Sequence, residues 1–325
     1  MDVHPPPFPP YLSAIHCILL RATDNERSVN PKYVFPSVLI LAAAITAIAL
    51  SLTHGHAVGL LDPQGVIAKR EQALMIKAAL LMLIVVVPVF ALTFGIAWHY
   101  RASNTRAQYR PSWEHNRIEE GIWWAVPMIV VAALAVVAWQ SAHALDPFRP
   151  IDSPMSPLTV EVVSLDWKWL FIYPAQGIAT MNYLAIPEQT PIAFKLTSDA
   201  PMNAFWIPQL GGQEMTMPGM ITQLHLMADA TGTYEGFSSN LSGAGFSSMH
   251  FPVRSMTTND FAAWVSQAQR SPNTLSFAAY TQLAQPSVHN PATVFRVTNS
   301  RLYAEIVMRF MTPPASGAPV MPMRP

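Results

Sequence analysis

The sequence predicts a membrane protein of mixed α and β structure, with a hairpin of two transmembrane helices, a β-sandwich and a helical C-terminal region. Hydrophobic residues make up 51% of the 325 residues and charged residues only 12%, whereas soluble domains carry about 25% charged residues. The apolar residues gather in three long runs, at 34–53, 74–98 and 121–140. After residue 157 the pattern changes to short alternating segments that are typical of strands.

Residues 1–57 form a predicted leader. Its start, MDVHPPPFPPYL, contains too many prolines for a regular helix. Lys32 then precedes the apolar run 34–53, and the small residues Gly55 and Ala57 follow it. This order fits a secretory signal peptide that is cleaved. An uncleaved first helix fits almost as well because the run nearly spans a membrane, and both interpretations stay open.

Residues 58–144 contain the predicted transmembrane hairpin. The runs 74–98 and 121–140 are long enough to cross about 30 Å of hydrocarbon. Tryptophans near both ends of the second run are typical of a membrane interface. The loop between the runs carries four arginines, Arg101, Arg106, Arg110 and Arg117. Because positive loops stay in the cytoplasm, we expect a multi-pass protein of the bacterial inner membrane with a periplasmic C-terminal part.

Residues 145–157, LDPFRPIDSPMSP, form a proline-rich linker to a predicted β domain at 158–254. The segment LTVEVVSLDWKWLFIY alternates over several residues and is rich in β-branched and aromatic types. TPIAFKLTSD and TQLHLMAD repeat the pattern, with Gly, Pro and Asn turns between them. Short strands at this spacing predict an antiparallel sandwich.

Residues 255–312 form the predicted helical C-terminal region, and residues 313–325 a tail. TTNDFAAWVSQAQRS begins with Thr and Asn, which are suitable helix caps. Helical spacing then places four residues on one face: Phe261, Trp264, Val265 and Ala268. SRLYAEIVMRFM, at 300–311, is a second helical segment.

The charge and cysteine content argue against nucleic acid as a partner and exclude features that need several cysteines. The formal net charge is zero and basic blocks are missing, so nucleic acid is not an expected partner. Cys17 is the single cysteine. An intrachain disulfide and a metal site with several cysteines are therefore excluded.

The order of hairpin, linker and sandwich, with the loop GFSSNLSGAGFSSMHF at 236–251, resembles subunit II of the haem–copper respiratory oxidases. The resemblance covers roughly residues 60–312. In that family the sandwich has a cupredoxin fold and holds a two-copper centre that takes electrons from cytochrome c. The ligands are an upstream His and a loop of pattern C-x-E-x-C-x-x-x-H-x-x-M, in which soft thiolates bridge the copper ions.

The resemblance implies that this chain has lost the copper ligands. The corresponding positions hold Asn203 for the upstream His, Ser238 and Ser242 for the cysteines, Asn240 for the Glu, Phe246 for the second His, and Met249, which alone is retained. Hydroxyls and amides are weak, hard ligands and a phenyl ring donates nothing. We therefore expect no cofactor and no metal in this chain.

The same loss is a feature of the quinol-oxidizing branch, subunit II of the cytochrome bo-type ubiquinol oxidases. The segments EVVSLDWKWLFIYPAQGIAT, MPGM and SPNTL are similar to that branch. The resemblance implies a non-redox subunit of a proton-pumping terminal oxidase, which oxidizes ubiquinol and reduces oxygen to water in aerobic respiration. Haem and copper are then expected in subunit I, which this chain would cap and help to assemble. Subunits III and IV and membrane lipid are the other expected partners.

Glu119 has two interpretations. A carboxylate in the first turn of a helix stabilises the positive end of the helix dipole. The resemblance also places Glu119 of NRIEEGIWWAVP at the acid that lies at the mouth of a proton-uptake channel of subunit I. No catalytic residue is expected in this chain.

There are two alternative classes of function. A copper-relay subunit of cytochrome c oxidase would need the missing Cys and His ligands. A copper-free, membrane-tethered periplasmic binding protein with a cupredoxin-like domain would act without a large partner.

Overall fold

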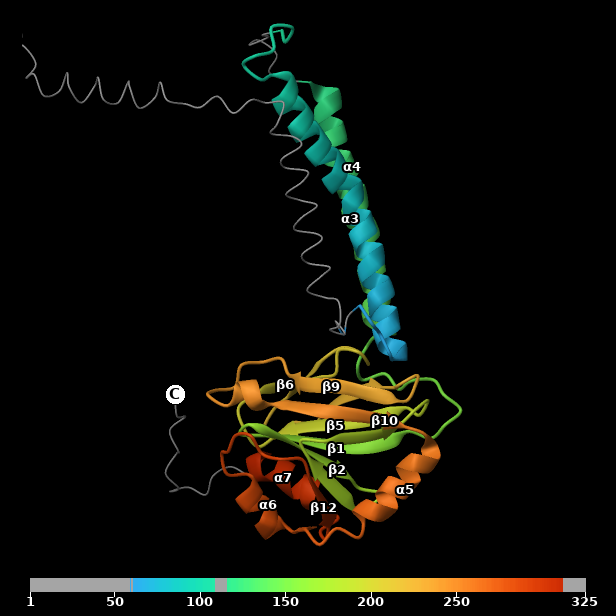
Figure 1. The fold of residues 1–325 in the computed structure, drawn as a ribbon. Helices are drawn as coiled ribbons and strands as arrows, with labels where there is room; N and C mark the ends of the chain where they lie inside the picture. The colour runs from blue at the N-terminus through green and yellow to red at the C-terminus, as the bar shows by residue number, and fades with distance from the viewer. Residues whose placement is uncertain (1–58, 60, 109–115, 312–325) are drawn as a thin grey trace, which may run out of the picture. The chain divides into compact units, whose positions relative to one another are not determined.

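The computed structural model describes residues 59, 61–108 and 116–311 (Figure 1). The predicted leader, Arg110 and the tail at 313–325 lie outside the described residues. Two long helices, α3 (Val66–His99) and α4 (Arg117–Ala144), come first, and a domain of two sheets, three further α-helices and a short 3-10 helix (Phe246–Ser248) follows. This is the order of elements that the sequence predicts.

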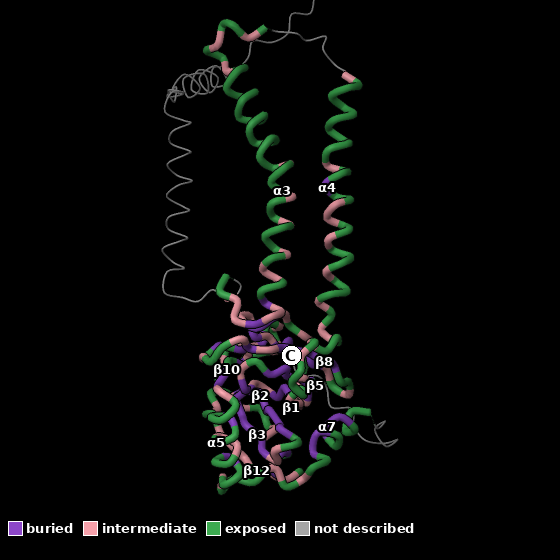
Figure 2. Tube along the Cα trace, turned by 90° about the vertical axis from the view of Figure 1, so that its right-hand side faces the viewer, coloured by how far each residue is buried: buried purple, intermediate pink, exposed green. Residues whose placement is uncertain are grey.

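Helices α3 and α4 are apolar but exposed (Figure 2). Their most apolar windows reach mean hydropathies of 2.7 and 2.3, and Val130 is the one buried residue of α4. With 34 and 28 residues, the helices are about 50 and 40 Å long. Both are therefore long and apolar enough to cross a membrane.

Helix α3 begins eight residues before its apolar run because its first turns bind the β domain. The Ala68 N–H donates to the Leu210 carbonyl at 3.1 Å, and the Gln64 N–H donates to the Gln209 carbonyl at 2.7 Å. Lys69 Nζ lies 2.6 Å from the Asp229 carboxylate. These polar contacts account for the hydrophilic start of the helix.

The β domain contains a seven-stranded sheet in the order β11-β12-β3-β2-β1-β5-β8 and a five-stranded sheet in the order β4-β10-β9-β6-β7. The strands are β1 (Leu158–Leu165), β2 (Lys168–Tyr173), β3 (Ile178–Met181), β4 (Leu184–Pro187), β5 (Ile192–Ser198), β6 (Asn203–Trp206), β7 (Glu214–Thr216), β8 (Thr222–Leu226), β9 (Gly232–Ser238), β10 (His250–Met256), β11 (Thr274–Leu275) and β12 (Thr293–Val297).

The predicted sandwich is present and most neighbouring strands are antiparallel, but three pairs are parallel, which the expectation of an antiparallel sandwich missed. Strand β1 runs parallel to β5, β10 to β4, and β11 to β12. The chain leaves the first sheet after β3, adds β4 to the second sheet, and returns as β5 beside β1. This crossing between the sheets makes β1 and β5 parallel neighbours, which short alternating segments cannot reveal.

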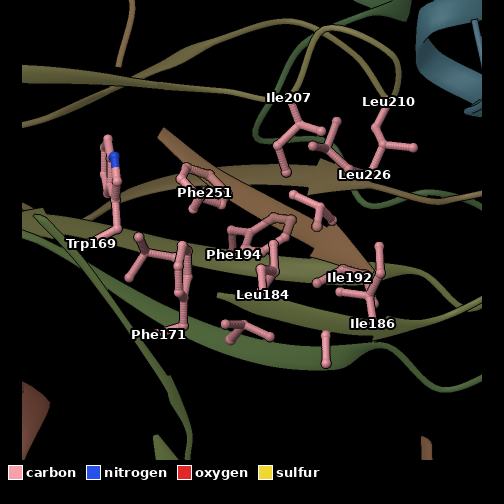
Figure 3. Close-up of a cluster of buried hydrophobic side chains, with 14 of the residues drawn as sticks. Trp169, Phe171, Leu184, Ile186, Ile192, Phe194, Ile207, Leu210, Leu226 and Phe251 are labelled. Carbon is pink, nitrogen blue, oxygen red and sulfur yellow. The ribbon is translucent and has the colours of Figure 1, made fainter. Parts of the chain in front are cut away.

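The main core lies between the two sheets and contains a cluster of aromatic rings among aliphatic side chains (Figure 3). Trp169 and Phe171 of β2 point toward Phe251 of β10, and all three are at most 1% exposed. The ring centroids of Phe171 and Phe251 are 5.0 Å apart, and those of Trp169 and Phe205 are 5.4 Å apart. Burying each such side chain stabilises the fold by about 1.5–3 kcal/mol.

A second core lies on the other face of the seven-stranded sheet, under α6 (Phe277–Leu283) and α7 (Leu302–Met311). Val160 and Val162 of β1 face the main core, whereas Val163 and Leu165 of the same strand face the second core. Strand β1 is thus buried on both faces. This double burial explains why its sequence is apolar with only partial alternation.

The C-terminal region is helical, as predicted, and it also contributes two strands to the sheet. Helix α5 (Thr258–Ala268) is capped by Thr257, whose hydroxyl accepts from the Asp260 N–H at 3.2 Å. Phe261 and Ala268 are buried, and Trp264 and Val265 pack against the main core. The predicted apolar face is therefore confirmed.

Polar contacts also join the C-terminal region to the sandwich. The Tyr280 hydroxyl of α6 donates to Asp199 Oδ2 at 2.6 Å, and Arg309 Nη1 of α7 lies 3.0 Å from the same oxygen. Lys168 Nζ donates to the Gln285 carbonyl at 2.7 Å. Burial lowers the pKa of Lys168, although the nearby Asp166 carboxylate opposes the shift. The sandwich and the C-terminal helices therefore form one packed body.

Candidate functional site

The candidate site is the loop between β9 and β10, together with the start of β6. Ser238 ends β9, Met249 immediately precedes β10, and Asn203 begins β6. Strand β9 pairs with both β10 and β6. Sheet pairing thus brings three segments of different sequence position to one end of the five-stranded sheet.

A buried hydrogen bond links two of the positions that sequence analysis selected. The Ser238 hydroxyl donates to Asn203 Oδ1 at 3.0 Å, and the Asn203 amide nitrogen donates to the Pro201 carbonyl at 2.9 Å. Asn203 is 0% exposed and Ser238 is 3% exposed. Both side chains are neutral, so their burial requires hydrogen-bond partners but no counter-ion.

Met249 holds the other end of the loop. Its side chain is 1% exposed, and its sulfur lies 3.6 Å from the Ser242 hydroxyl oxygen. Its N–H donates to the Phe246 carbonyl at 3.0 Å, and its carbonyl accepts from the Ser238 N–H at 3.2 Å. Asn240 fixes the outer part of the loop by donating to the Met202 carbonyl at 2.8 Å. These contacts therefore connect the six selected positions, which lie in the loop and at the strand ends beside it.

Trp167 covers this loop, a role that sequence analysis missed. Its indole nitrogen donates to the Ser242 carbonyl at 3.4 Å. Gly243 has a positive φ of 124°, and a Cβ atom at Gly245 would lie 2.4 Å from the Trp167 ring. The GAG run is the sequence signal, because only glycine allows both this backbone and the close approach of the indole.

The donor atoms at these positions do not fit a two-copper centre. They comprise hydroxyl oxygens, amide groups, a phenyl ring and one thioether, whereas such a centre needs thiolates and imidazoles. Across residues 59, 61–108 and 116–311, no group of three or more His, Cys, Asp or Glu side chains is placed to hold a metal ion. The loop is instead held by neutral hydrogen bonds and packing.

Glu119 lies in another part of the chain, in the first turn of α4. Asn116 caps this helix, since its side-chain oxygen accepts from the Ile118 N–H at 3.1 Å and the Glu119 N–H at 3.4 Å. Glu119 is exposed. A helix of about 40 Å separates it from the linker and the β domain, so Glu119 does not belong to the loop site.

Two family models match the β domain and the C-terminal region. The model described as cytochrome c oxidase subunit II, periplasmic domain, matches residues 158–256, and the COX aromatic rich motif matches residues 269–314. The cytochrome bo(3) ubiquinol oxidase subunit 2 of Pseudomonas aeruginosa is 46% identical, over 80% of this chain and 78% of that protein. The chain belongs to the ubiquinol oxidase subunit II family.

A second relative has a similar identity, and a solved structure is more distant. The ubiquinol oxidase subunit 2 of Acetobacter aceti is 45% identical, over 80% of this chain and 85% of that protein. Among solved structures, the periplasmic domain of subunit II of cytochrome oxidase from Bradyrhizobium japonicum is 24% identical with a TM-score of 0.35, over 36% of this chain and 96% of that chain. Family membership confirms the resemblance that the sequence motifs predict.

We predict that Ser238→Ala destabilises the β domain much more than Ser242→Ala. The first change leaves the buried Asn203 Oδ1 without its donor, which costs about 1–2 kcal/mol. The second removes only a weak contact to sulfur and should cost about 0.5 kcal/mol or less. Urea unfolding of the full-length chain in detergent, followed by tryptophan emission, measures both. Equal losses for the two variants would contradict the proposed importance of the Ser238–Asn203 bond.

Proposed function

We propose that this chain is the non-redox subunit II of a proton-pumping terminal ubiquinol oxidase. In this proposal it caps the haem–copper subunit I and supports assembly of the complex. The reaction of the complex is oxidation of ubiquinol coupled to reduction of oxygen to water. Haem and copper belong to subunit I, and the complex binds the ubiquinol. The observation that carries the proposal is a loop with an intact structure but without the thiolates and imidazoles of a copper centre.

The positions Asn203, Ser238, Asn240, Ser242, Phe246 and Met249 are, in this proposal, former copper-ligand positions. The buried Ser238–Asn203 bond supports it, because a neutral pair now occupies positions that require charged or strong donors in a copper site. Ubiquinol is soluble in the membrane and can deliver electrons without a periplasmic relay. Loss of the ligands is therefore compatible with activity of the complex.

The proposed location is the bacterial inner membrane, with α3 and α4 as a transmembrane hairpin and the β domain in the periplasm. The exposed apolar surfaces of both helices support this arrangement. Arg101 and Arg106 follow α3, and Arg117 begins α4, so positive charge gathers at the end expected in the cytoplasm. The proposed linker at 145–157 then connects the hairpin to the cupredoxin-like domain at 158–254.

Partners in the proposed complex are subunit I, the smaller membrane subunits III and IV, and membrane lipid. The large exposed apolar area of the hairpin supports burial against other membrane helices. A copper-free, membrane-tethered binding protein is the second candidate function. Such a protein would share the loop without thiolates and imidazoles but would need no large partner.

Purification separates these two candidates. When the chain is extracted from its native membrane in a mild detergent, we expect it to co-elute with a haem-bearing subunit at about 1:1 stoichiometry. Haem absorbance across the elution profile, with quantitative protein analysis of each fraction, measures the ratio. A chain that elutes alone while the oxidase remains intact would support the tethered binding protein and contradict the oxidase assignment.

We also propose that Glu119 collects protons at the mouth of an uptake channel of subunit I. Its exposure at the cytoplasmic end of α4 supports this role. Glu119→Ala should lower ubiquinol-dependent oxygen consumption and proton pumping of the assembled complex. Glu120→Ala is the matched control, because it removes a neighbouring first-turn carboxylate with the same helix-dipole cost of about 0.3–1 kcal/mol. Unchanged turnover in both variants would leave Glu119 only the dipole role.

A further inference from the structure

A polar cavity lies where α3, α4, the linker and the β domain meet. Its volume is about 300 Å³. Arg70 and Glu71 of α3 line it, together with Asp146, Arg149 and Asp152 of the linker region. A 2.9 Å contact between His225 Nδ1 on β8 and the Pro147 carbonyl helps to fix the linker there.

The cavity collects charges of both signs that do not neutralise one another by direct contact. Two guanidinium groups and three carboxylates line it. Among the described residues, the ion pairs are Lys69–Asp229, His250–Glu235 and Arg309–Asp199. Arg70 and Arg149 are thus in no ion pair within the part of the chain that the structure describes. A zwitterion could satisfy both signs of charge at once.

A groove between the two long helices continues from this cavity. One side is formed by Arg70, Ala73, Leu74 and Lys77 of α3, and the other by Val137, Gln140, Ser141 and Ala144 of α4. Both sets follow the i, i+3, i+4, i+7 spacing of one helix face. The groove has a volume of about 280 Å³ and shares Arg70, Ala144 and Leu145 with the cavity. Small residues such as Ala73 and Ser141 leave this space open.

The two spaces correspond to two depths of a bilayer, if α3 spans it as proposed. The apolar run of α3 starts at residue 74, and Arg70 precedes it by about one helical turn, or roughly 6 Å. Arg70 and the cavity then lie at headgroup depth, whereas Leu74 and Val137 of the groove lie in hydrocarbon. Lys77 can extend its ammonium group toward the headgroups.

We propose that the cavity and groove bind one zwitterionic phospholipid with a primary ammonium headgroup. Arg70 and Arg149 would hold its phosphate, because guanidinium groups bind phosphate oxygens in a forked geometry. Glu71, Asp146 and Asp152 would hold its ammonium group, and the groove its glycerol and the upper part of an acyl chain. An anionic headgroup would face three carboxylates, and a quaternary ammonium could not donate hydrogen bonds to them.

The lipid site rests on the proposed membrane hairpin. A lipid bound there would connect the hairpin to the β domain. The lipid would touch α3, α4 and the linker at the same time. It would therefore stabilise the junction through which the β domain is attached to the membrane segment.

Native mass spectrometry of the full-length chain tests this site. The chain is purified in mild detergent, stripped of lipid, and incubated with equal amounts of phosphatidylethanolamine, phosphatidylcholine and phosphatidylglycerol with identical acyl chains. We expect retention of one phosphatidylethanolamine with about fivefold preference, the effect of one partly exposed ionic contact. Arg70→Gln and Arg149→Gln should each reduce retention of the lipid about fivefold, because each removes one contact to the phosphate.

Arg101→Gln is the matched control, since Arg101 follows the other end of α3, with its guanidinium over the Trp98 ring. It should leave both the retention of the lipid and the headgroup preference unchanged. Equal retention of the three lipids, stronger retention of phosphatidylglycerol, or full retention in both test variants would overturn the site. Loss of the lipid when the chain assembles with subunit I would also overturn it, because a protein surface would then fill the cavity.

Alkaline carbonate extraction tests the membrane hairpin separately. Release of the chain into the soluble fraction would overturn the hairpin and, with it, the lipid site. A chain that stays in the membrane but shows no headgroup preference would refute the lipid site alone.

Discussion

The Ser238–Asn203 hydrogen bond is the interaction on which the candidate site depends. Both side chains are buried at the end of the five-stranded sheet, and a buried polar group without a partner destabilises a fold. A metal centre could satisfy such positions through coordination bonds. In this chain a hydroxyl and an amide satisfy each other, and the loop needs no ion to keep its structure.

Packing in the rest of the domain explains why the sandwich is retained without the copper ligands. The aromatic cluster around Phe171 and Phe251 fills the space between the sheets without any contribution from a metal. The second core uses the opposite face of β1 and β2 to bind α6 and α7. Since the same two strands support both cores, the sandwich cannot be lost without releasing the C-terminal region.

Sequence reasoning recovers the features that depend on local patterns. The apolar runs indicate α3 and α4, helical spacing gives the buried face of α5, and the quoted motifs identify the family. Features set by distant contacts were not predicted. Strand β11 has two residues, too few for a recognisable pattern, and the parallel pairing of β1 with β5 depends on the path of the chain between sheets. The cover that Trp167 gives to Gly245 likewise joins residues far apart in sequence.

We propose that a loop without thiolates and imidazoles cannot hold two copper ions and that electrons therefore reach the oxidase by another route. The most direct measurement is copper titration of the full-length chain, followed by removal of weakly bound ions and determination of copper content and near-infrared absorbance. We expect no retained copper and no near-infrared band. Two copper ions per chain with such a band would contradict it.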